Sequence, residues 1–294
     1  MIDAGDVAAF EQARPALRGL AYRILGSYAE AEDAVQDTFV KWQAADRAGI
    51  RTPQAWLTTV CTRRCLDMLK AASRSRVDYV GTWLPEPVQT ATEEDPVELA
   101  SSVTTAFLLL LDRLTAKERA AYLLRTIFDH SYAEIGSILG LQEATCRKLV
   151  SRAEAAIRAG KVRQTIDRQH QEELLDAFQR AVNSGETDRL SAMLADDIAL
   201  HADGGGKVSA ASRVLQGHDE VMGFLIKVLG SAWPRWRQVR TEINGMLGMV
   251  IYEGETIRAS LTFGFDAAGA LSDIYIMRNP DKFGGLSVGT ESLH

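Results

Sequence analysis

The residues best suited to contact DNA lie in a short segment, residues 131–153. Residues 131–139 have helical spacing, Gly140 and Leu141 follow as a tight turn, and residues 142–153 form a second helical stretch. Two short helices joined by a turn that contains glycine have the geometry that places the second helix in a major groove. Side chains that suit base edges or phosphates make the candidate contacts Gln142, Thr145, Arg147, Lys148, Ser151 and Arg152. The inner side of the same stretch is expected to hold Thr145, Cys146, Leu149 and Val150. An ordinary helical hairpin with a solvated basic face is the alternative.

Charge is segregated along the chain. Residues 142–163 contain six basic and two acidic side chains, and residues 60–76 contain five and one, so each segment carries a net charge of +4. Two separated basic elements predict two contacts along a nucleic acid, each with a phosphate component that is independent of base sequence. Residues 28–37 hold four acids and no base. Such a face repels DNA and favours a basic protein surface as its partner, or it is simply solvated.

Composition excludes several classes of protein. The chain has 294 residues, of which 46% are hydrophobic and 24% charged, so it can bury real cores in two or three domains. Its formal net charge of −6 argues against a general polycation that coats nucleic acid. No apolar stretch is long enough to span a bilayer, the first ten residues lack the basic start of a signal peptide, and three cysteines make no disulfide framework. We therefore expect a soluble, cytoplasmic protein without a membrane partner, with Cys61 and Cys65 as buried filler.

Three regions with different periodicity position these candidates. Apolar spacing is helical over residues 7–76 and again over residues 104–160. The segment between them, residues 77–98, has three prolines and six acids and no Lys or Arg, which indicates a linker. Residues 167–282 begin with helical spacing and continue with alternating strands at 235–244, 246–252, 257–265 and 271–277. This order predicts an α+β domain with a curved antiparallel sheet.

The third region carries a glycine run that follows a strand ending at His201. Three consecutive glycines at 204–206 allow another chain segment to approach the backbone closely. His201, Asp203, His218 and Asp219 could supply acid–base groups or metal ligands, but their spacing forms no catalytic or metal-binding constellation. We expect no cofactor and no metal here.

Taken together, these segments resemble a bacterial RNA polymerase sigma factor of the extracytoplasmic-function (ECF) class. Residues 20–26 and 31–39 resemble the stretch with which that family grips core RNA polymerase. Residues 53–57 open a helix that resembles the reader of the promoter −10 element, and residues 131–135 with the following helix resemble the −35 reader. The resemblance covers residues 6–160 in the expected order.

The resemblance implies a role for each group of residues. It assigns core polymerase binding, at the β′ clamp and the β subunit, to Asp33, Val35, Gln36, Asp37 and Phe39. It assigns contacts at the −10 element to Arg63, Arg64, Lys70 and Arg74, and contacts at the −35 element to the candidates on residues 142–152. We further expect the loop at residues 47–52 to capture an extruded base. Two positions depart from the family pattern. Thr62 and Arg63 stand where many relatives have Arg-Asn, and Gln142 replaces the usual Ser or Thr, which weakens the helix cap.

Three further motifs resemble one subgroup of the family, the SigJ-like or group-41 members, which carry a fused C-terminal SnoaL-like domain. The motifs comprise Trp83, Leu84, Pro85, Glu86 and Pro87; Asp203, Gly204, Gly205, Gly206 and Lys207; and Asn279, Pro280, Asp281 and Lys282. The resemblance implies that these residues are regulatory and that the third domain controls the sigma factor in cis, in place of a separate anti-sigma factor. A cone-like fold of this kind commonly encloses an apolar pocket, so a small ligand is a further expected partner.

The expected organisation has five parts. Residues 1–76 form an all-α sigma2 helical bundle, residues 77–103 an acidic linker with prolines, and residues 104–162 an all-α sigma4 helix-turn-helix domain. Residues 167–283 form an α+β SnoaL-like (NTF2-like) cone domain, and residues 284–294 a tail. We expect this chain to be a non-catalytic initiation factor that binds core polymerase and promoter DNA. We expect its acidic linker to pass through a basic nucleic-acid channel, because its charge resembles that of RNA. The alternatives are a helix-turn-helix regulator with a ligand-sensing domain, and an enzyme that acts through the third domain.

Overall fold

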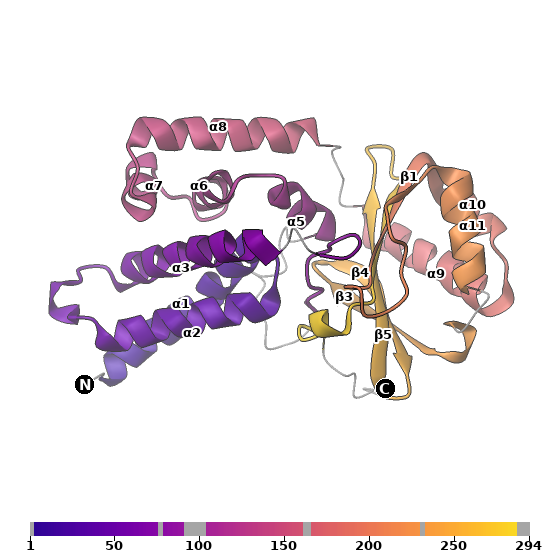
Figure 1. Cartoon of the computed structure of the whole chain (residues 1–294), viewed down its shortest axis with the longest axis horizontal. Helices are drawn as coiled ribbons and strands as arrows, with labels where there is room; N and C mark the ends of the chain where they lie inside the picture. Colours follow the sequence, from indigo (N-terminus) through magenta and orange to yellow (C-terminus); the bar gives the residue numbers. More distant parts are fainter. Residues whose placement is uncertain (1–2, 76–78, 91–103, 161–165, 230–232, 287–294) are drawn as a thin grey trace. The chain divides into compact units, whose positions relative to one another are not determined.

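The computed structural model describes residues 3–75, 79–90, 104–160, 166–229 and 233–286 (Figure 1). The chain divides into two compact units. The first contains residues 1–78, 93–103 and 107–160, and the second contains residues 79–92, 104–106 and 161–294. The sequence predicts a linker at residues 77–103 and a helical domain from residue 104, whereas in the structure residues 79–92 and 104–106 group with the third domain. Hydrogen bonds described below account for this difference.

The first unit begins with a helical bundle. Its elements are α1 (Ala4–Leu25), α2 (Tyr28–Ala44), the 3₁₀ turn η1 (Arg47–Gly49) and α3 (Pro53–Ser75). Local sequence signals set the helix starts: Asp3 forms a capping box with Asp6, and the Ser27 hydroxyl accepts a hydrogen bond from the backbone N–H of Glu30 (3.1 Å). The apolar stripes expected from the sequence face inward, with Ile24 and Leu57 fully buried. Cys61 and Cys65 are also fully buried, as expected.

The remainder of the first unit comprises α5 (Thr105–Asp112), which starts in the second unit, followed by α6 (Ala116–Thr126), α7 (Tyr132–Leu139) and α8 (Glu143–Ala159). A buried arginine joins α6 to α1: Arg119 donates to the carbonyl of Ile24 (2.6 Å) and to Oδ1 of Asp112 (2.9 Å). The predicted turn between α7 and α8 forms, because Gly140 adopts the left-handed conformation (φ 66°) that ends α7. The helix-turn-helix expected from the sequence is therefore present.

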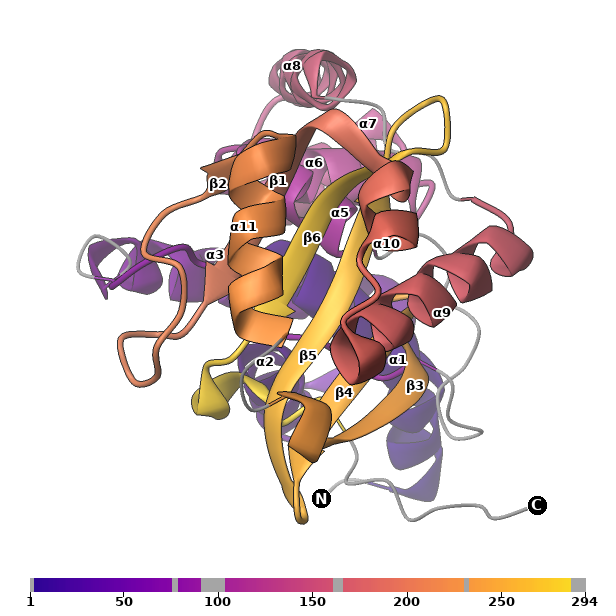
Figure 2. The same ribbon diagram turned by 90° about the vertical axis from the view of Figure 1, so that its right-hand side faces the viewer.

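In the described part of the second unit, three α-helices pack against a six-stranded sheet. Figure 2 shows its helices on one face of the sheet. The elements are α9 (Arg168–Ser184), α10 (Asp188–Met193), β1 (Leu194–Asp203), β2 (Leu215–Gln216), α11 (His218–Leu229), η3 (Trp233–Arg235), β3 (Arg237–Ile243), β4 (Met246–Glu253), β5 (Thr256–Phe265), β6 (Leu271–Met277) and η4 (Pro280–Lys282). The core between helices and sheet is apolar, with Phe178, Leu225 and Ile274 almost fully buried.

The sheet is mixed, and the prediction of a purely antiparallel sheet was wrong. The strand order is β2-β1-β6-β5-β4-β3, and β1 pairs with β6 in parallel while the other neighbours are antiparallel. Strands β3 to β6 form a meander whose last strand returns beside β1, so this pairing joins segments that local alternation does not connect. Helix α11 was not expected from the sequence.

None of the described helices combines the length and the apolar character that crossing a bilayer requires.

Candidate functional site

A buried carboxylate stands at the end of β1 and gathers residues from three parts of the chain. Asp203 is completely inaccessible to solvent. Its Oδ1 accepts hydrogen bonds from the Tyr79 hydroxyl (2.5 Å) and the Gly205 N–H (2.9 Å), and its Oδ2 accepts from the Leu84 N–H (2.9 Å) and Lys282 Nζ (2.7 Å). Burying a carboxylate is costly unless donors and a counter-charge surround it, and Asp203 has both.

Lys282 completes this arrangement. Its residue is 8% exposed, and besides Asp203 its Nζ donates to the carbonyl oxygen of Leu84 (2.6 Å). The same ammonium lies 4.5 Å from the ring centroid of Trp83 and 4.9 Å from that of Tyr79. The cation therefore has one carboxylate, one carbonyl and two aromatic faces around it. We call residues 79–90 the linker segment, and Asp203, Asn279 and Lys282 the linker clamp.

The glycine run allows this close packing. A Cβ built on Gly205 would lie 2.3 Å from Nδ2 of Asn279, and one on Gly206 would lie 3.1 Å from Cβ of Val80. Gly205 also has φ +58°, a conformation that side chains disfavour. The Asn279 amide in turn donates to the Tyr79 hydroxyl (3.0 Å). An exposed ion pair between Lys207 and Asp281 joins the same two motifs at the surface.

The rest of the linker segment pairs with the turn between β3 and β4. The N–H of Asn244 donates to the carbonyl of Val88 (2.8 Å), and its side-chain oxygen accepts from the Val88 N–H (3.0 Å). The N–H of Thr90 donates to the carbonyl of Glu242 (3.0 Å), while Thr105 makes a hydroxyl–hydroxyl hydrogen bond with Thr262 (2.9 Å). These bonds explain why residues 79–92 and 104–106 group with the third domain. The linker residues 76–78 and 91–103, with five of the six acids, lie outside the described residues.

Tyr79 has a distinctive protonation behaviour. Burial, followed by the hydrogen bond to Asp203, raises the pKa of its hydroxyl well above the ordinary tyrosine value. The phenol therefore stays protonated, and a donor to Asp203, at all physiological pH values. Neither Tyr79 nor Asn244 was singled out in the sequence, although Asn244 and Gly245 form the dipeptide typical of a tight hairpin turn.

The residues expected to bind core polymerase lie on α2 with differing exposure. Asp33 and Gln36 are exposed, while Val35 is 2% exposed and belongs mainly to the bundle core. Val35, Gln36 and Phe39 line a surface hollow of about 370 Å³ between α1 and α2, in which the Phe39 ring packs against Phe10 with centroids 4.6 Å apart. The lining of the hollow combines apolar and polar side chains. Asp37 instead forms an ion pair with Arg64 (2.6 Å).

The residues expected at the −10 element all have protein partners where the structure describes them. The Arg63 guanidinium donates from Nε to the Ile138 carbonyl (2.8 Å) and from Nη2 to the Ser137 carbonyl (3.0 Å), at the end of α7. Arg64 bonds Asp37, Lys70 bonds Asp67 (3.0 Å), and the side chain of Arg74 lies outside the described part of the chain. Thr62 is fully buried, so of the unusual pair Thr62-Arg63 only Arg63 faces outward. In the loop at residues 47–52, Arg47 is fixed by Asp6 (2.7 Å).

The residues expected at the −35 element are all exposed, Gln142 at the N-cap of α8 and the other five on the helix itself. Gln142 makes no capping hydrogen bond, which agrees with the expected weakening of this cap. Arg147 forms an ion pair with Glu143 and its guanidinium lies 4.5 Å from the ring centroid of Tyr132. Thr145 is exposed, so its expected place on the inner side was wrong, whereas Cys146 and Val150 are buried there.

The two histidines considered for catalysis both have hydrogen-bond partners. His201 hydrogen-bonds Asp273 (3.2 Å) and stacks on Tyr275, and His218 hydrogen-bonds the Ser191 hydroxyl (2.9 Å). Within the described residues, no three His, Cys, Asp or Glu side chains gather in a way that could hold a metal ion.

Comparisons with known proteins identify the family. The family model described as Sigma-70 region 2 matches residues 9–75, and the model described as Sigma-70, region 4 matches residues 104–157. The chain is 33% identical over 296 residues to the ECF RNA polymerase sigma factor SigJ of Mycobacterium tuberculosis, covering 95% of this chain and 94% of that protein. The chain therefore belongs to the ECF sigma factors, a family that binds core RNA polymerase and promoter DNA.

Relatives extend this likeness to the third domain. The chain is 32% identical over 278 residues to a probable ECF sigma factor, SigI, of Mycobacterium tuberculosis, with 93% of each chain covered. The crystal structure of Mycobacterium tuberculosis SigJ superposes with a TM-score of 0.77 at 31% identity, covering 96% of this chain and all of that chain. The expected fold, two helical sigma domains followed by an α+β SnoaL-like domain, is confirmed.

Proposed function

We propose that this chain is a promoter-recognition subunit of RNA polymerase and that its third domain controls it in cis by holding the linker segment. In this proposal α2 binds the β′ clamp and β subunit of the core enzyme in the cytoplasm. Helix α3 contacts the −10 element, and α8 contacts the −35 element. The exposed basic side chains of α8 and the apolar hollow beside α2 support these assignments.

Helix α3 is not ready to bind DNA in this structure. Arg63 uses Nε and Nη2 on the carbonyls at the end of α7, where the helix dipole favours a cation. Arg64 is neutralised by Asp37. These partners must be exchanged for phosphates before α3 contributes to promoter binding. We infer that the structure represents the form that has not engaged a promoter.

The linker segment supports the regulatory part of the proposal. The sequence predicts that this acidic stretch enters a nucleic-acid channel of the polymerase. In the structure Tyr79 and the Leu84 backbone bind the linker clamp, and Glu86 is only 7% exposed. The same residues cannot occupy the clamp and a polymerase channel at once. Clamped and polymerase-bound states are therefore alternatives, and the clamp opposes polymerase binding.

The observation that carries the regulatory proposal is the buried pair of Asp203 and Lys282, whose polar atoms bind the linker segment directly. The same observation argues against an enzymatic role for the third domain. Both oxygens of Asp203 are saturated with donors, so this carboxylate is not available as a general base. We therefore propose a non-catalytic role.

A capture experiment with bacterial core polymerase tests both parts. The full chain and the variant Asp33→Lys are compared, with Glu186→Lys as a matched charge reversal at an exposed position of the third domain. Asp33→Lys should weaken capture at moderate salt and Glu186→Lys should not. Equal capture of all three chains would contradict the assignment of α2. No capture of these chains or of Lys282→Met, in which the clamp is broken, would contradict the proposed polymerase role.

The regulatory part is tested with Lys282→Met, which breaks the clamp, and Lys207→Met, which breaks only the exposed ion pair. We expect Lys282→Met to be captured more tightly and to direct more transcription in vitro, while Lys207→Met behaves as the parent chain. If both variants match the parent chain, the clamp does not regulate and the cis-control proposal fails.

A further inference from the structure

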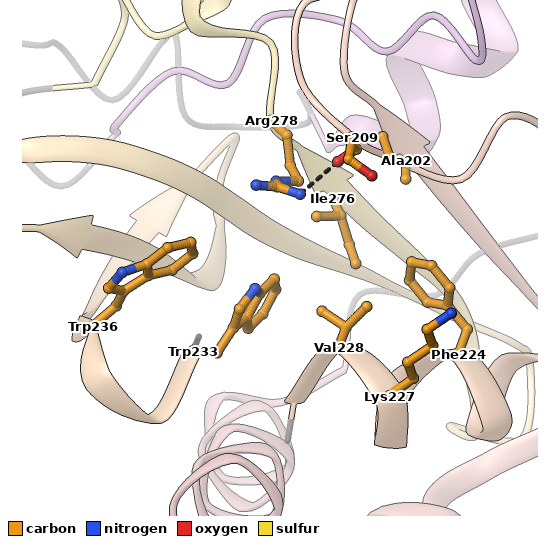
Figure 3. A pocket seen from close by; sticks show the side chains of 10 residues that line it. Ala202, Ser209, Phe224, Lys227, Val228, Trp233, Trp236, Ile276 and Arg278 are labelled. Atoms are coloured by element: carbon orange, nitrogen blue, oxygen red, sulfur yellow. Dashed lines mark hydrogen bonds between the residues drawn. The ribbon is translucent and has the colours of Figure 1, made fainter. Parts of the chain in front are cut away.

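A cavity opens on the helix-covered face of the second unit, beneath α11 and η3 (Figure 3). Its volume is about 350 Å³, which suits a small organic molecule. Its wall is largely apolar and partly aromatic, formed by Phe224, Val228, Trp233, Trp236 and Ile276. Such walls favour a flat or extended hydrocarbon group over a strongly hydrated one.

One end of this cavity carries a cation, Arg278, that forms no ion pair with a described residue. Figure 3 shows the Arg278 guanidinium beside the space bounded by Trp233, Trp236 and Ile276, with one hydrogen bond to the Ser209 carbonyl. Its Nε is buried and has no hydrogen-bond partner in the described structure. Burial, with a smaller contribution from Arg258, lowers the pKa of Arg278, which shows a cation that is poorly solvated.

The charged side chains of the described wall are all positive. The exposed Lys227 adds a second cation, and no Asp or Glu belongs to the wall that the structure describes. A guanidinium with free N–H donors in a water-poor site matches the two oxygens of a carboxylate, to which it can donate in parallel. A ligand without an acceptor would leave the Nε of Arg278 unsatisfied, and a single neutral oxygen would accept one hydrogen bond without balancing the charge.

We propose that this cavity binds a small carboxylic acid with an apolar body, the carboxylate on the Arg278 guanidinium and the body against Trp233, Trp236 and Phe224. The ligand is thus an amphipathic anion. Its apolar part is either an aromatic ring or an alkyl chain, and the two share the chemistry of recognition.

The cavity adjoins the linker clamp. Two residues of its wall are chain neighbours of the clamp: Ala202 directly precedes Asp203, and Arg278 directly precedes Asn279. The backbone N–H groups of Arg278 and Asn279 both donate to the Asp203 carbonyl (2.7 and 2.9 Å). Neighbouring strand residues point to opposite faces of a sheet, so β1 carries the cavity on one face and the clamp on the other. Ligand binding itself does not depend on the proposed cis control, and it is measured without polymerase.

Isothermal titration calorimetry on the full chain tests the proposal. The probes are phenylbutyrate, which has a ring, and decanoate, which has a chain, against the neutral phenylbutanol and the cationic phenylbutylamine. The variant is Arg278→Gln, and Arg189→Gln removes an equal charge from an exposed position of the same domain. Binding of the neutral alcohol to Arg278→Gln at parental affinity shows that the variant keeps an intact cavity.

In the parent chain we expect at least one acid to bind about ten- to a hundredfold more tightly than the alcohol and the amine. Arg278→Gln should abolish this preference, and Arg189→Gln should keep it. The acid that binds more tightly shows whether the apolar part of the ligand is a ring or an alkyl chain. Equal binding of acid and alcohol to the parent chain, an unchanged preference in Arg278→Gln, or no binding of any probe would each overturn the proposal.

Discussion

Replacement of Lys282 by methionine should release the linker segment. Methionine is an unbranched side chain one heavy atom shorter than lysine. The substitution removes the only cation that is hydrogen-bonded to Asp203 in the described structure, and Asp203 is fully buried. Removing one partner of a buried ion pair costs about 3–5 kcal/mol, because the other charge remains without compensation. Undocking the linker segment lets water reach Asp203, so this cost falls on the docked state rather than on the undocked one.

Hydrogen–deuterium exchange of the peptide that covers residues 79–90 measures this release. The Leu84 amide donates to Asp203 and exchanges only when the segment opens. A penalty of about 3–5 kcal/mol corresponds to roughly two to three and a half orders of magnitude in the opening equilibrium. We expect exchange in Lys282→Met to accelerate by this factor, or to reach the rate of an unprotected amide.

The matched control is Lys207→Met, which removes an ion pair whose side chains are 53% and 60% exposed. Exposed pairs contribute about 0–1 kcal/mol, so exchange should rise by less than about fivefold. The double variant Asp203→Asn/Lys282→Met, which removes both charges, should accelerate exchange less than the two single variants combined. Equal exchange in Lys282→Met and Lys207→Met would refute the reasoning that the buried pair holds the linker.

Three other perturbations follow from the same geometry. The pKa of Tyr79 is raised in the folded chain, so its contribution to linker docking is complete below about pH 10, where unfolded tyrosine titrates. This contribution is lost as the pH rises through the folded pKa. The alkaline loss of protection against amide exchange at residues 79–90 should therefore be smaller in Tyr79→Phe. Gly205→Ala should lower the free energy of unfolding by about 1–3 kcal/mol more than Gly254→Ala does. Gly254 shares φ +58°, but a Cβ built on it has nothing within 4 Å. Equal denaturation midpoints of the two variants would exclude the predicted clash with Asn279. Arg63→Gln removes two hydrogen bonds to α7 and should speed amide exchange in that helix several-fold, whereas unchanged exchange would mean that these bonds add no stability.

The helical unit was predictable because its signals are local. Capping residues such as Ser27 and Ser131, apolar stripes and the left-handed Gly140 each act within a few positions of the chain. The exposure of the α8 side chains proposed to contact DNA followed from the same periodicity. Thr145 was misplaced because a periodic stripe defines a face only to within about one residue at its edge.

The third domain was less predictable because its decisive contacts are long-range. The parallel pairing of β1 with β6 and the bonds from Asp203 to Tyr79 and Lys282, 124 and 79 positions away, have no local signature. The motifs around Asp203 and Asn279 were visible by resemblance, yet their convergence on one carboxylate was not. Helix α11 was missed although Val221, Met222, Leu225 and Val228 follow helical spacing, because strand signals dominated the surrounding sequence. Arg278 directly precedes the motif at residues 279–282, but the sequence did not predict that it shares a cavity wall with Trp233 and Trp236.

The linker clamp also limits how this protein can be recombined. Its polar contacts join residues that precede the helix-turn-helix to residues that follow it, so the third domain is not a self-contained module at the end of the chain. A chimera that received only residues 166–286 would bring Asp203 and Lys282 without the tyrosine hydroxyl and the backbone groups that satisfy them. A functional exchange of this domain between relatives therefore requires that residues 79–90 and the C-terminal domain are transferred together.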